Sequence, residues 1–238
     1  LDKEGELTFL NYGCANDKNL KLNEDDEINR YPIQLYHHVA SSINLKNLEV
    51  LEVGCGRGGG ASYIAKYLKP KSIMGVDLCK KAIKFCRKHY SVKGLSFSYA
   101  NALNLPFKDN NFDVVINVES SHCYTDMDKF LREVYKVLKP QGYFLFADFR
   151  DKERVSLLKK QLTNSGLVII KEERITPNII NALNLDNQRK LDIIERDVPE
   201  FLHNTTKQFA TVKGSKQYNS LVNGKVEYLH FVLQKQGL

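Results

Sequence analysis

A glycine-rich run at residues 51–60 is the part of the sequence best suited to hold a ligand. It reads Leu-Glu-Val-Gly-Cys-Gly-Arg-Gly-Gly-Gly and begins as a short apolar segment. Gly54, Gly56 and Gly58 allow the backbone to turn tightly, and they allow a ligand to approach it without a Cβ in the way. We therefore expect a cofactor to bind at this turn, next to Cys55.

Two kinds of cofactor fit these glycines. Gly54, Gly56 and Gly59 match the dinucleotide pattern G-x-G-x-x-G, so the glycines alone leave a nicotinamide cofactor and S-adenosylmethionine (SAM) open. Glu52 places a carboxylate at the end of the apolar segment, where it would repel a pyrophosphate and attract a cationic sulfonium or amino group. Glu52 therefore favours SAM.

Asp77 ends the next apolar run, some twenty residues after the glycine turn, and Leu78 follows it. An acidic side chain at this place accepts both hydroxyls of an adenosine ribose. Either cofactor would use it, so Asp77 supports an adenosyl ligand without choosing between the two.

His122 and Asp148 are the candidate catalytic residues. His122 follows the fourth apolar run, and an imidazole with an unperturbed pKa of about 6.5 can act as a general base at neutral pH. Its structural alternative is a histidine packed in a loop. Asp148 closes the fifth apolar run, where it either faces the cleft or caps the following helix. In the cleft it would orient His122 or act as a second base. We interpret Cys55 and Cys123 as small apolar residues rather than nucleophiles.

Strand and helix patterns alternate through the middle of the chain, which predicts a parallel sheet with helices on both faces. Ligands bind such sheets beyond the carboxyl ends of the strands. The predicted strands are 48–53, 72–78, 95–100, 112–118 and 142–149, and the predicted helices are 60–68, 80–90, 127–138 and 151–164.

Two segments lie outside this alternation. Strands predicted at 167–172 and 227–233 bracket a long helical segment, so the pattern divides the chain into four parts. These are a helical N-terminal arm or lid (1–47), the cofactor-binding core (48–175), a helical insertion that caps the substrate site (176–225) and the last core strand (226–238). The alternative for the insertion is a cap that only stabilises the fold.

The N-terminal arm contributes further candidates. An aromatic hydroxyl at Tyr12 could close over the methionine carboxylate of SAM. One face of the segment that holds Gln34, Tyr36, His37 and His38 would line the substrate cavity, and the other face would be surface.

The composition indicates a compact globular protein. The chain has 238 residues, of which 42% are hydrophobic and 26% charged. No apolar run approaches the ~18 residues of a membrane span.

Acidic residues near the start (Asp2, Glu4, Glu6, Asp17) argue against a targeting segment, so we expect the protein to lie in the cytoplasm. The five cysteines include no C-x-x-C pair, which fits a reducing compartment, and no cluster of carboxylates and histidines suggests a metal.

The net charge of +7 raises the question of a polyanionic partner. Nine Lys or Arg residues lie between Lys66 and Lys93, against the single Asp77. No aromatic residues interleave with them as a base-stacking surface would require, so we interpret the basic residues as solvated helix faces. The pattern argues against nucleic acid as the substrate.

The glycine-rich run, the run that ends at Asp77 and the third and fourth predicted strands follow one another in this order. Together they resemble the class I SAM-dependent methyltransferases. Segments over nearly the whole chain are similar to small-molecule O-methyltransferases of the phthiotriolone and rebeccamycin-sugar kind; they are 9–13, 31–39, 118–124, 146–149 and 212–215. The resemblance implies a Rossmann-like, doubly wound, mostly parallel seven-stranded sheet. It implies SAM as the cofactor, S-adenosylhomocysteine as the product, and no metal.

The resemblance also implies further cofactor contacts. Asn117 and Val118 end the fourth strand, and Asn101, Ala102 and Leu103 follow the third. The family meets the adenine amino group with an acidic residue after the third strand, where this chain has Asn101. The amide oxygen of Asn101 can accept the same hydrogen bond.

The sequence thus predicts methyl transfer from SAM to a hydroxyl of a small molecule, such as a polyketide, lipid or glycoside. We expect in-line displacement, with His122 as the general base and Asp148 paired to it. The alternatives are transfer to nitrogen or carbon of a small molecule, a nucleic-acid methyltransferase, and a non-catalytic SAM-binding or dehydrogenase-like domain. Asn117-Val-Glu-Ser stands where many nucleic-acid enzymes have Asn/Asp-Pro-Pro-Tyr, which counts against that alternative. A homodimer, with the arm crossing to a second subunit, stays open.

Overall fold

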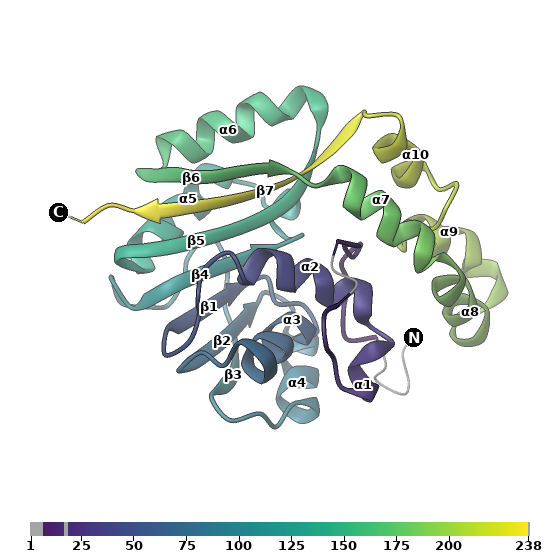
Figure 1. The fold of residues 1–238 in the computed structure, drawn as a ribbon, viewed down its shortest axis with the longest axis horizontal. Coiled ribbons are helices and arrows are strands. Elements are labelled where there is room, and N and C mark those ends of the chain that lie inside the picture. The colour runs from purple at the N-terminus through teal and green to yellow at the C-terminus, as the bar shows by residue number, and fades with distance from the viewer. Residues whose placement is uncertain (1–6, 17–18, 238) are drawn as a thin grey trace.

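The computed structural model of the chain describes residues 7–16 and 19–237, and its centre is a seven-stranded sheet (Figure 1). The strand order is β3-β2-β1-β4-β5-β7-β6, and every pair is parallel except those of β7, which runs antiparallel to β5 and β6. This confirms the predicted fold class. The strands are β1 (Glu49–Val53), β2 (Ser72–Asp77), β3 (Leu95–Tyr99), β4 (Phe112–Val118), β5 (Leu138–Asp151), β6 (Leu167–Arg174) and β7 (Val226–Lys235).

Ten α-helices lie within the described residues. They are α1 (Glu24–Glu27), α2 (Arg30–Ala40), α3 (Gly59–Tyr63), α4 (Lys80–His89), α5 (Met127–Val137), α6 (Val155–Asn164), α7 (Thr176–Leu185), α8 (Asn187–Asp197), α9 (His203–Phe209) and α10 (Lys216–Val222). Short 3-10 turns add Ser121–Cys123, Lys152–Arg154 and Glu200–Leu202. The four acidic residues used above to argue against a targeting segment lie outside the described residues.

Several predicted boundaries differ from the structure by a few residues, and two of these differences have a visible structural cause. The helix after the glycine turn ends in a π-helical turn (Ile64–Leu68), which closes at Lys69 with φ 49°. Strand β5 begins at Leu138 rather than at residue 142, because the Lys-Pro-Gln-Gly segment is part of the strand. It continues the strand as an irregular stretch in which Gln141 has φ 65° and the pairing with β4 shifts register.

The core lies on both faces of the sheet. Alternate residues of a strand point to opposite faces, and in β4 Val114 and Ile116 pack in the cluster that contains α2 residues, whereas Val115 packs in the cluster that contains α5 and α6 residues. α2 buries Ile33, Leu35 and Val39 among other side chains. Within the arm, α2 is therefore integral to the core, whereas α1 buries none of its residues.

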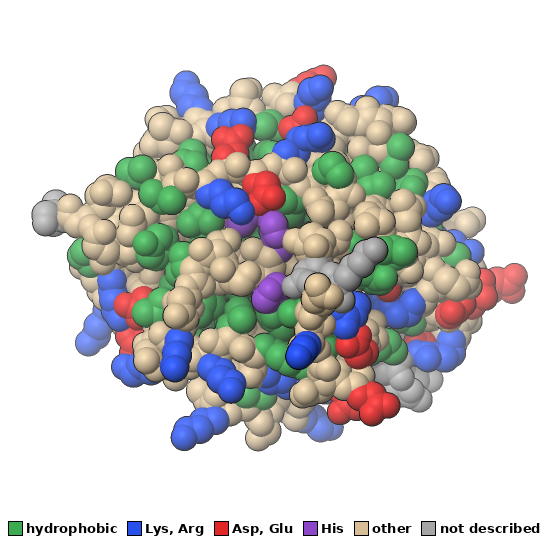
Figure 2. Space-filling model, viewed as in Figure 1, with side chains coloured by type: hydrophobic (Ala, Val, Ile, Leu, Met, Phe, Trp, Pro, Cys, Tyr) green, Lys and Arg blue, Asp and Glu red, His purple; other side chains and the backbone are tan. Residues whose placement is uncertain are grey.

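The segment between β6 and β7, which the sequence analysis treats as a helical insertion, forms α7 to α10. Figure 1 shows these helices and α1 beyond the end of the sheet to which the β6 arrow points, where the carboxyl ends of the parallel strands lie. Figure 2 shows the molecule in the same view with its side chains, and histidine side chains gather near the centre. None of the helices among residues 7–16 and 19–237 is long and apolar enough to cross a membrane.

Substitution of a core aromatic should cost far more stability than substitution of an exposed one. Phe146 is fully buried in β5, with ring centroids 5.5 Å from Phe144 and 6.2 Å from Phe231. Phe146→Ala should lower the free energy of unfolding by about 3–5 kcal/mol, because it leaves a cavity. Phe201→Ala, at a side chain that is 83% exposed, should change it by less than about 0.5 kcal/mol. Urea unfolding measures both, and equal losses would contradict the burial pattern.

Candidate active site

The glycine turn joins β1 to α3 and packs closely against the loop after β4. Gly54 has φ 78°, and a Cβ there would lie 1.9 Å from Ser120 Oγ. A Cβ on Gly60 would lie 2.0 Å from the Tyr36 ring. Larger residues at these two positions would displace the neighbouring loop or α2, so the glycines are required by close approach as well as by the turn.

A cavity of about 180 Å³ opens at this turn. Gly54, Cys55, Gly56, Asp77 and Val118, which were predicted to contact a cofactor, line it, and so does Tyr36, which was predicted to contact substrate. The other lining residues were not predicted as ligand contacts; they are Thr8, Phe9, Leu10, Asn11, Arg57, Gly59, Gly60, Glu119, Ser120 and Cys123. A signal existed for several of them, because residues 9–11, 119–120 and 123 lie inside segments that carry the family resemblance.

Asp77 fixes the turn from the end of β2. Its Oδ2 accepts a hydrogen bond from the Gly56 amide at 2.8 Å, and its Oδ1 accepts one from the Cys79 amide at 2.8 Å. A carboxylate oxygen has further acceptor capacity, so Asp77 can hold the glycine turn and still accept a ribose hydroxyl.

Glu52 is fully buried beneath the turn and does not line the cavity. Tyr36, which does, donates to Glu52 Oε1 at 2.7 Å, while Oε2 has no hydrogen-bond partner among the described residues. Burial, assisted by the charge of Asp77, raises the pKa of Glu52 to about 7. An unpaired buried carboxylate oxygen, a ribose acceptor and a glycine cradle together fit an adenosyl cofactor with a cationic end.

The remaining predicted cofactor residues do not line this cavity. Asn117 is buried and donates to the Val53 carbonyl and to Tyr124 Oη, which ties β1 to β4. Asn101 is exposed, and its Oδ1 accepts from the Leu103 amide at 2.9 Å. Three others, Gly58, Leu78 and Ala102, are also outside the lining.

His122 and Asp148 meet as predicted. His122 Nδ1 lies 2.8 Å from Asp148 Oδ1, the histidine coming from the turn after β4 and the aspartate from β5. The second carboxylate oxygen accepts from Ser121 Oγ at 2.6 Å and from the His122 amide at 2.9 Å. Arg150 Nη1 lies 3.1 Å from it. Asp148 therefore faces the histidine and does not cap the following helix through its side chain.

These contacts set the charges of the pair. Burial by itself would raise the pKa of Asp148, but the hydrogen bond from His122 and the Arg150 charge outweigh burial and lower it. Burial would lower the pKa of His122, but the hydrogen bond to Asp148 and its charge outweigh burial and raise it. An ionised Asp148 accepts a hydrogen bond from Nδ1–H, which leaves the lone pair of the neutral imidazole on Nε2.

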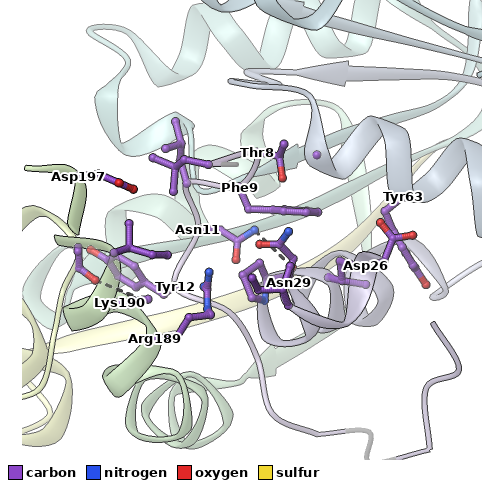
Figure 3. A pocket seen from close by; sticks show the side chains of 18 of the residues that line it. Thr8, Phe9, Asn11, Tyr12, Asp26, Asn29, Tyr63, Arg189, Lys190 and Asp197 are labelled. Carbon is purple, nitrogen blue, oxygen red and sulfur yellow. Dashed lines mark hydrogen bonds between the residues drawn. The ribbon is translucent and has the colours of Figure 1, made fainter. Parts of the chain in front are cut away.

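An aromatic row connects this pair to a second, larger cavity. The His122 ring lies 4.4 Å from that of Phe149, and Phe149 stacks on Tyr12 at 5.2 Å. Tyr12 lines a cavity of about 860 Å³ between the N-terminal segment and helices α1, α2, α8 and α9 (Figure 3). Its apolar lining includes Ile33, Ile193, Ile194 and Phe209. His122 itself lines neither cavity.

Lys190 and Glu119 are two charged groups at these cavities that the sequence reasoning missed. Lys190 lines the larger cavity, donates to the Ala210 carbonyl at 3.3 Å, and has its pKa lowered by burial (Figure 3). Glu119 has φ 46° and accepts from the Tyr12 amide at 2.9 Å and from Tyr228 Oη at 3.0 Å. Burial raises the pKa of Glu119 to about 7.

The other substrate candidates of the arm make contacts within the protein. Gln34 Oε1 accepts from the Asn16 amide, and His37 Nδ1 lies 2.7 Å from Tyr63 Oη. His38 Nε2 lies 3.1 Å from Glu173 Oε2. None of Gln34, His37 and His38 lines either cavity.

Comparison with known proteins identifies the family. The family model for the methyltransferase domain matches residues 51–146. The chain is 38% identical over 232 residues to a phthiotriol/phenolphthiotriol dimycocerosates methyltransferase of Mycobacterium tuberculosis, covering 97% of this chain and 86% of that protein. It is 37% identical to a fatty-acid O-methyltransferase of Mycolicibacterium smegmatis, covering 98% and 85%. The chain therefore belongs to the class I SAM-dependent methyltransferases that include these relatives.

Solved structures agree on the fold. A cyclopropane synthase from Mycobacterium tuberculosis superposes with a TM-score of 0.74 at 15% identity, over 99% of this chain and 95% of that one. A geranyl diphosphate C-methyltransferase from Streptomyces coelicolor superposes with a TM-score of 0.70 at 15% identity, over 98% and 94%. At this identity the likeness concerns the fold alone.

The buried Glu52 should make stability depend on pH. Folding raises its pKa from 4.5 to about 7, so its contribution to the free energy of unfolding falls as the pH rises through this range. The Glu52→Gln variant has no carboxyl group to ionise, so it does not lose this stability. From about pH 5 to about pH 8 the free energy of unfolding of the variant, minus that of wild type, should therefore rise by about 3 kcal/mol. Urea unfolding at both pH values measures this difference.

Glu49→Gln is the matched control for this experiment. Hydrogen bonds from Lys139 and Lys71 lower the pKa of Glu49 from 4.5 to about 2, so between about pH 5 and pH 8 Glu49 is ionised in the folded state and largely ionised in the unfolded state. Its effect on stability should be the same at both pH values. A Glu52→Gln effect that is equally flat would show that Glu52 is not protonated on folding.

Proposed function

We propose that the chain transfers the methyl group of SAM to a hydroxyl oxygen of a lipid-like small molecule, with His122 as the general base. The observation that carries this proposal is the His122–Asp148 contact at the edge of the sheet where the glycine turn lies. The relatives' names support an oxygen acceptor and a lipid, because one is a fatty-acid O-methyltransferase and the other acts on phthiotriol dimycocerosates.

SAM when bound supplies an electrophilic methyl group that a nucleophile displaces in line with the sulfur. His122 Nε2 takes the proton from the acceptor hydroxyl, because Nδ1–H is already donated to Asp148. Asp148 stays ionised and stabilises the imidazolium that forms. Ser121 and Arg150 fix its carboxylate, so the ring has one orientation.

The larger cavity is the proposed acceptor site. Its apolar lining suits a hydrocarbon chain, and its volume of about 860 Å³ lies within the range of roughly 300–1,000 Å³ typical of ligand pockets. The row Tyr12, Phe149 and His122 leads from its wall to the proposed base. The cofactor cavity, about 180 Å³, is below that range, and residues 8–11 line both cavities. We infer that this segment shifts when SAM binds.

Removal of the proposed base should slow methylation of hydroxyl acceptors selectively. His122→Ala should lower kcat by about 10²–10⁴-fold for an alcohol or phenol, which must lose a proton. It should have little effect on a carboxylate acceptor, which is already ionised at neutral pH. Product mass spectrometry with a long-chain alcohol, an alkylphenol and a fatty acid measures this, and S-adenosylhomocysteine affinity by calorimetry checks that the cofactor site is intact. Equal rates in wild type and variant for all three acceptors, or methylation at carbon or nitrogen only, would refute the proposal.

Loss of the partner carboxylate should shift the pH profile. Asp148 raises the pKa of His122, so Asp148→Asn should lower that pKa and move the acid limb of kcat/KM to lower pH. The plateau should also fall, since the imidazolium loses its ionic partner. An acid limb that stays in place, with S-adenosylhomocysteine affinity retained, would show that His122 does not set it.

The acceptor site can be tested by filling the cavity. Ile194 lies in α8 and lines the larger cavity. Ile194→Trp should raise KM for a long-chain acceptor at least about ten-fold and leave a short-chain analogue nearly unchanged, because only the long chain needs the lost volume. Val222→Trp, at an exposed residue outside the cavity, is the control. A loss that is the same for both chain lengths would place the acceptor chain elsewhere.

A further inference from the structure

Two histidines and a glutamate from three elements meet on the face of the sheet that α2 covers. His38 Nε2 of α2 and His230 Nδ1 of β7 lie 3.1 Å and 3.5 Å from the same atom, Oε2 of Glu173 in β6. All three atoms are within 4.8 Å of one another. In Figure 2 histidine side chains gather near the centre of the molecule, next to a basic and an acidic side chain.

This cluster is separate from the proposed catalytic pair. His230 pairs across the strands with Ala147, which packs in the core cluster that contains α2. Asp148 pairs with Leu229, which packs in the cluster on the other face. Strand alternation therefore directs His230 to the opposite face of the sheet from Leu229.

The buried His230 ring has an unsatisfied nitrogen. Ser42 Oγ donates to the His38 carbonyl at 3.3 Å and lies 3.4 Å from His230 Nε2, so Nε2–H can donate to this oxygen. The lone pair of Nδ1 then faces the carboxylate of Glu173, and Nδ1 has no hydrogen-bond partner among the described residues. His230 is fully buried and the Glu173 side chain is 37% exposed, so the two facing lone pairs lie where the core meets the surface. They repel each other, and a cation between them would remove the repulsion.

We propose that His38, Glu173 and His230 bind a zinc-type divalent transition metal ion. Ligands at about 2.0–2.1 Å from a tetrahedral Zn²⁺ lie about 3.3 Å apart, and the two distances to Glu173 Oε2 bracket this value. Two imidazole nitrogens and one carboxylate oxygen form a familiar ligand set for this ion, with water as the fourth ligand.

The surroundings suit this role. Asn16 Nδ2 lies 2.7 Å from His38 Nδ1, and with its amide turned the oxygen would accept Nδ1–H and leave Nε2 for the metal. Lys171 Nζ lies 2.8 Å from Glu173 Oε2 on a half-exposed side chain, so it can move aside and open a path from the surface. A bound ion would tie α2 to β6 and β7, and α2 carries Tyr36 at the glycine turn.

Zinc titration of metal-free protein tests the proposal without any assay of activity. Wild type should bind one equivalent of Zn²⁺ by competition calorimetry, and Co²⁺ should give the visible absorption of a tetrahedral site. His38→Gln and Glu173→Gln should each weaken Zn²⁺ binding at least about ten-fold. Lys171→Met should tighten it, because a competing positive charge is removed. Zn²⁺ should raise the Tm of wild type and not that of the two weakened variants.

Two controls locate the ion. His122→Ala should bind Zn²⁺ as wild type does, which separates this site from the His122–Asp148 pair, and Cys123→Ser should do the same for the exposed thiol. Far-ultraviolet circular dichroism checks that each variant is folded. Lys171→Met keeps all three proposed ligands, so tighter Zn²⁺ binding by this variant cannot come from a damaged fold. No binding by wild type, binding unchanged in both His38→Gln and Glu173→Gln, or loss of binding in a control variant would each overturn the proposal.

Discussion

The parallel pairing of β1 with β2 and β4 is the constraint on which the rest of the site depends. Val50 of β1 is level with Ile73 of β2 and with Val114 of β4, so the three strands run together and end at one edge. The glycine turn, Asp77 and the loop that holds His122 follow directly after those ends. Residues separated by tens of positions thereby share one site, and the surrounding helices need only cover the faces of the sheet.

Buried carboxyl groups give this edge its electrostatic character. Asp148 receives enough hydrogen bonds and positive charge to stay ionised in spite of burial. Glu52 is as deeply buried but has fewer partners, and burial raises the pKa of Glu52 and that of Glu119 to about 7. With Asp77 at the end of β2, this edge holds four carboxyl groups, which together favour a cationic ligand over a phosphate. This agrees with the sulfonium cofactor of the family to which the chain belongs.

The N-terminal segment links the two cavities. Residues 8–11 line both, and the adjoining Tyr12 is held by Glu119 through its amide and by Phe149 through ring stacking. The positive φ of Glu119 turns the chain out of β4, and its carboxylate reaches both Tyr12 and Tyr228. One short segment thus depends on the loop after β4, on β5 and on β7, so a change at the cofactor turn can reach the larger cavity through few contacts.

The sequence by itself determined the alternating elements, the glycine turn and Asp77, and it placed His122 and Asp148 at one edge, because strand and helix periodicity are local and parallel strands bring their following residues together. The family resemblance implied that His122 and Asp148 pair, and the tertiary structure decided that Asp148 faces His122 rather than the following helix. Local signals do not show which side chains the remaining segments bring to this edge. Tertiary packing decided that Tyr36, rather than Glu52, lines the cavity wall, and that Gln34, His37 and His38 face other parts of the protein. It also assembled His38, Glu173 and His230, although the sequence shows no cluster of carboxylates and histidines, since His38 and Glu173 are 135 positions apart. Spacing along the chain reports neighbours in helices and strands, whereas such long-range contacts depend on the order and register of strands in the sheet.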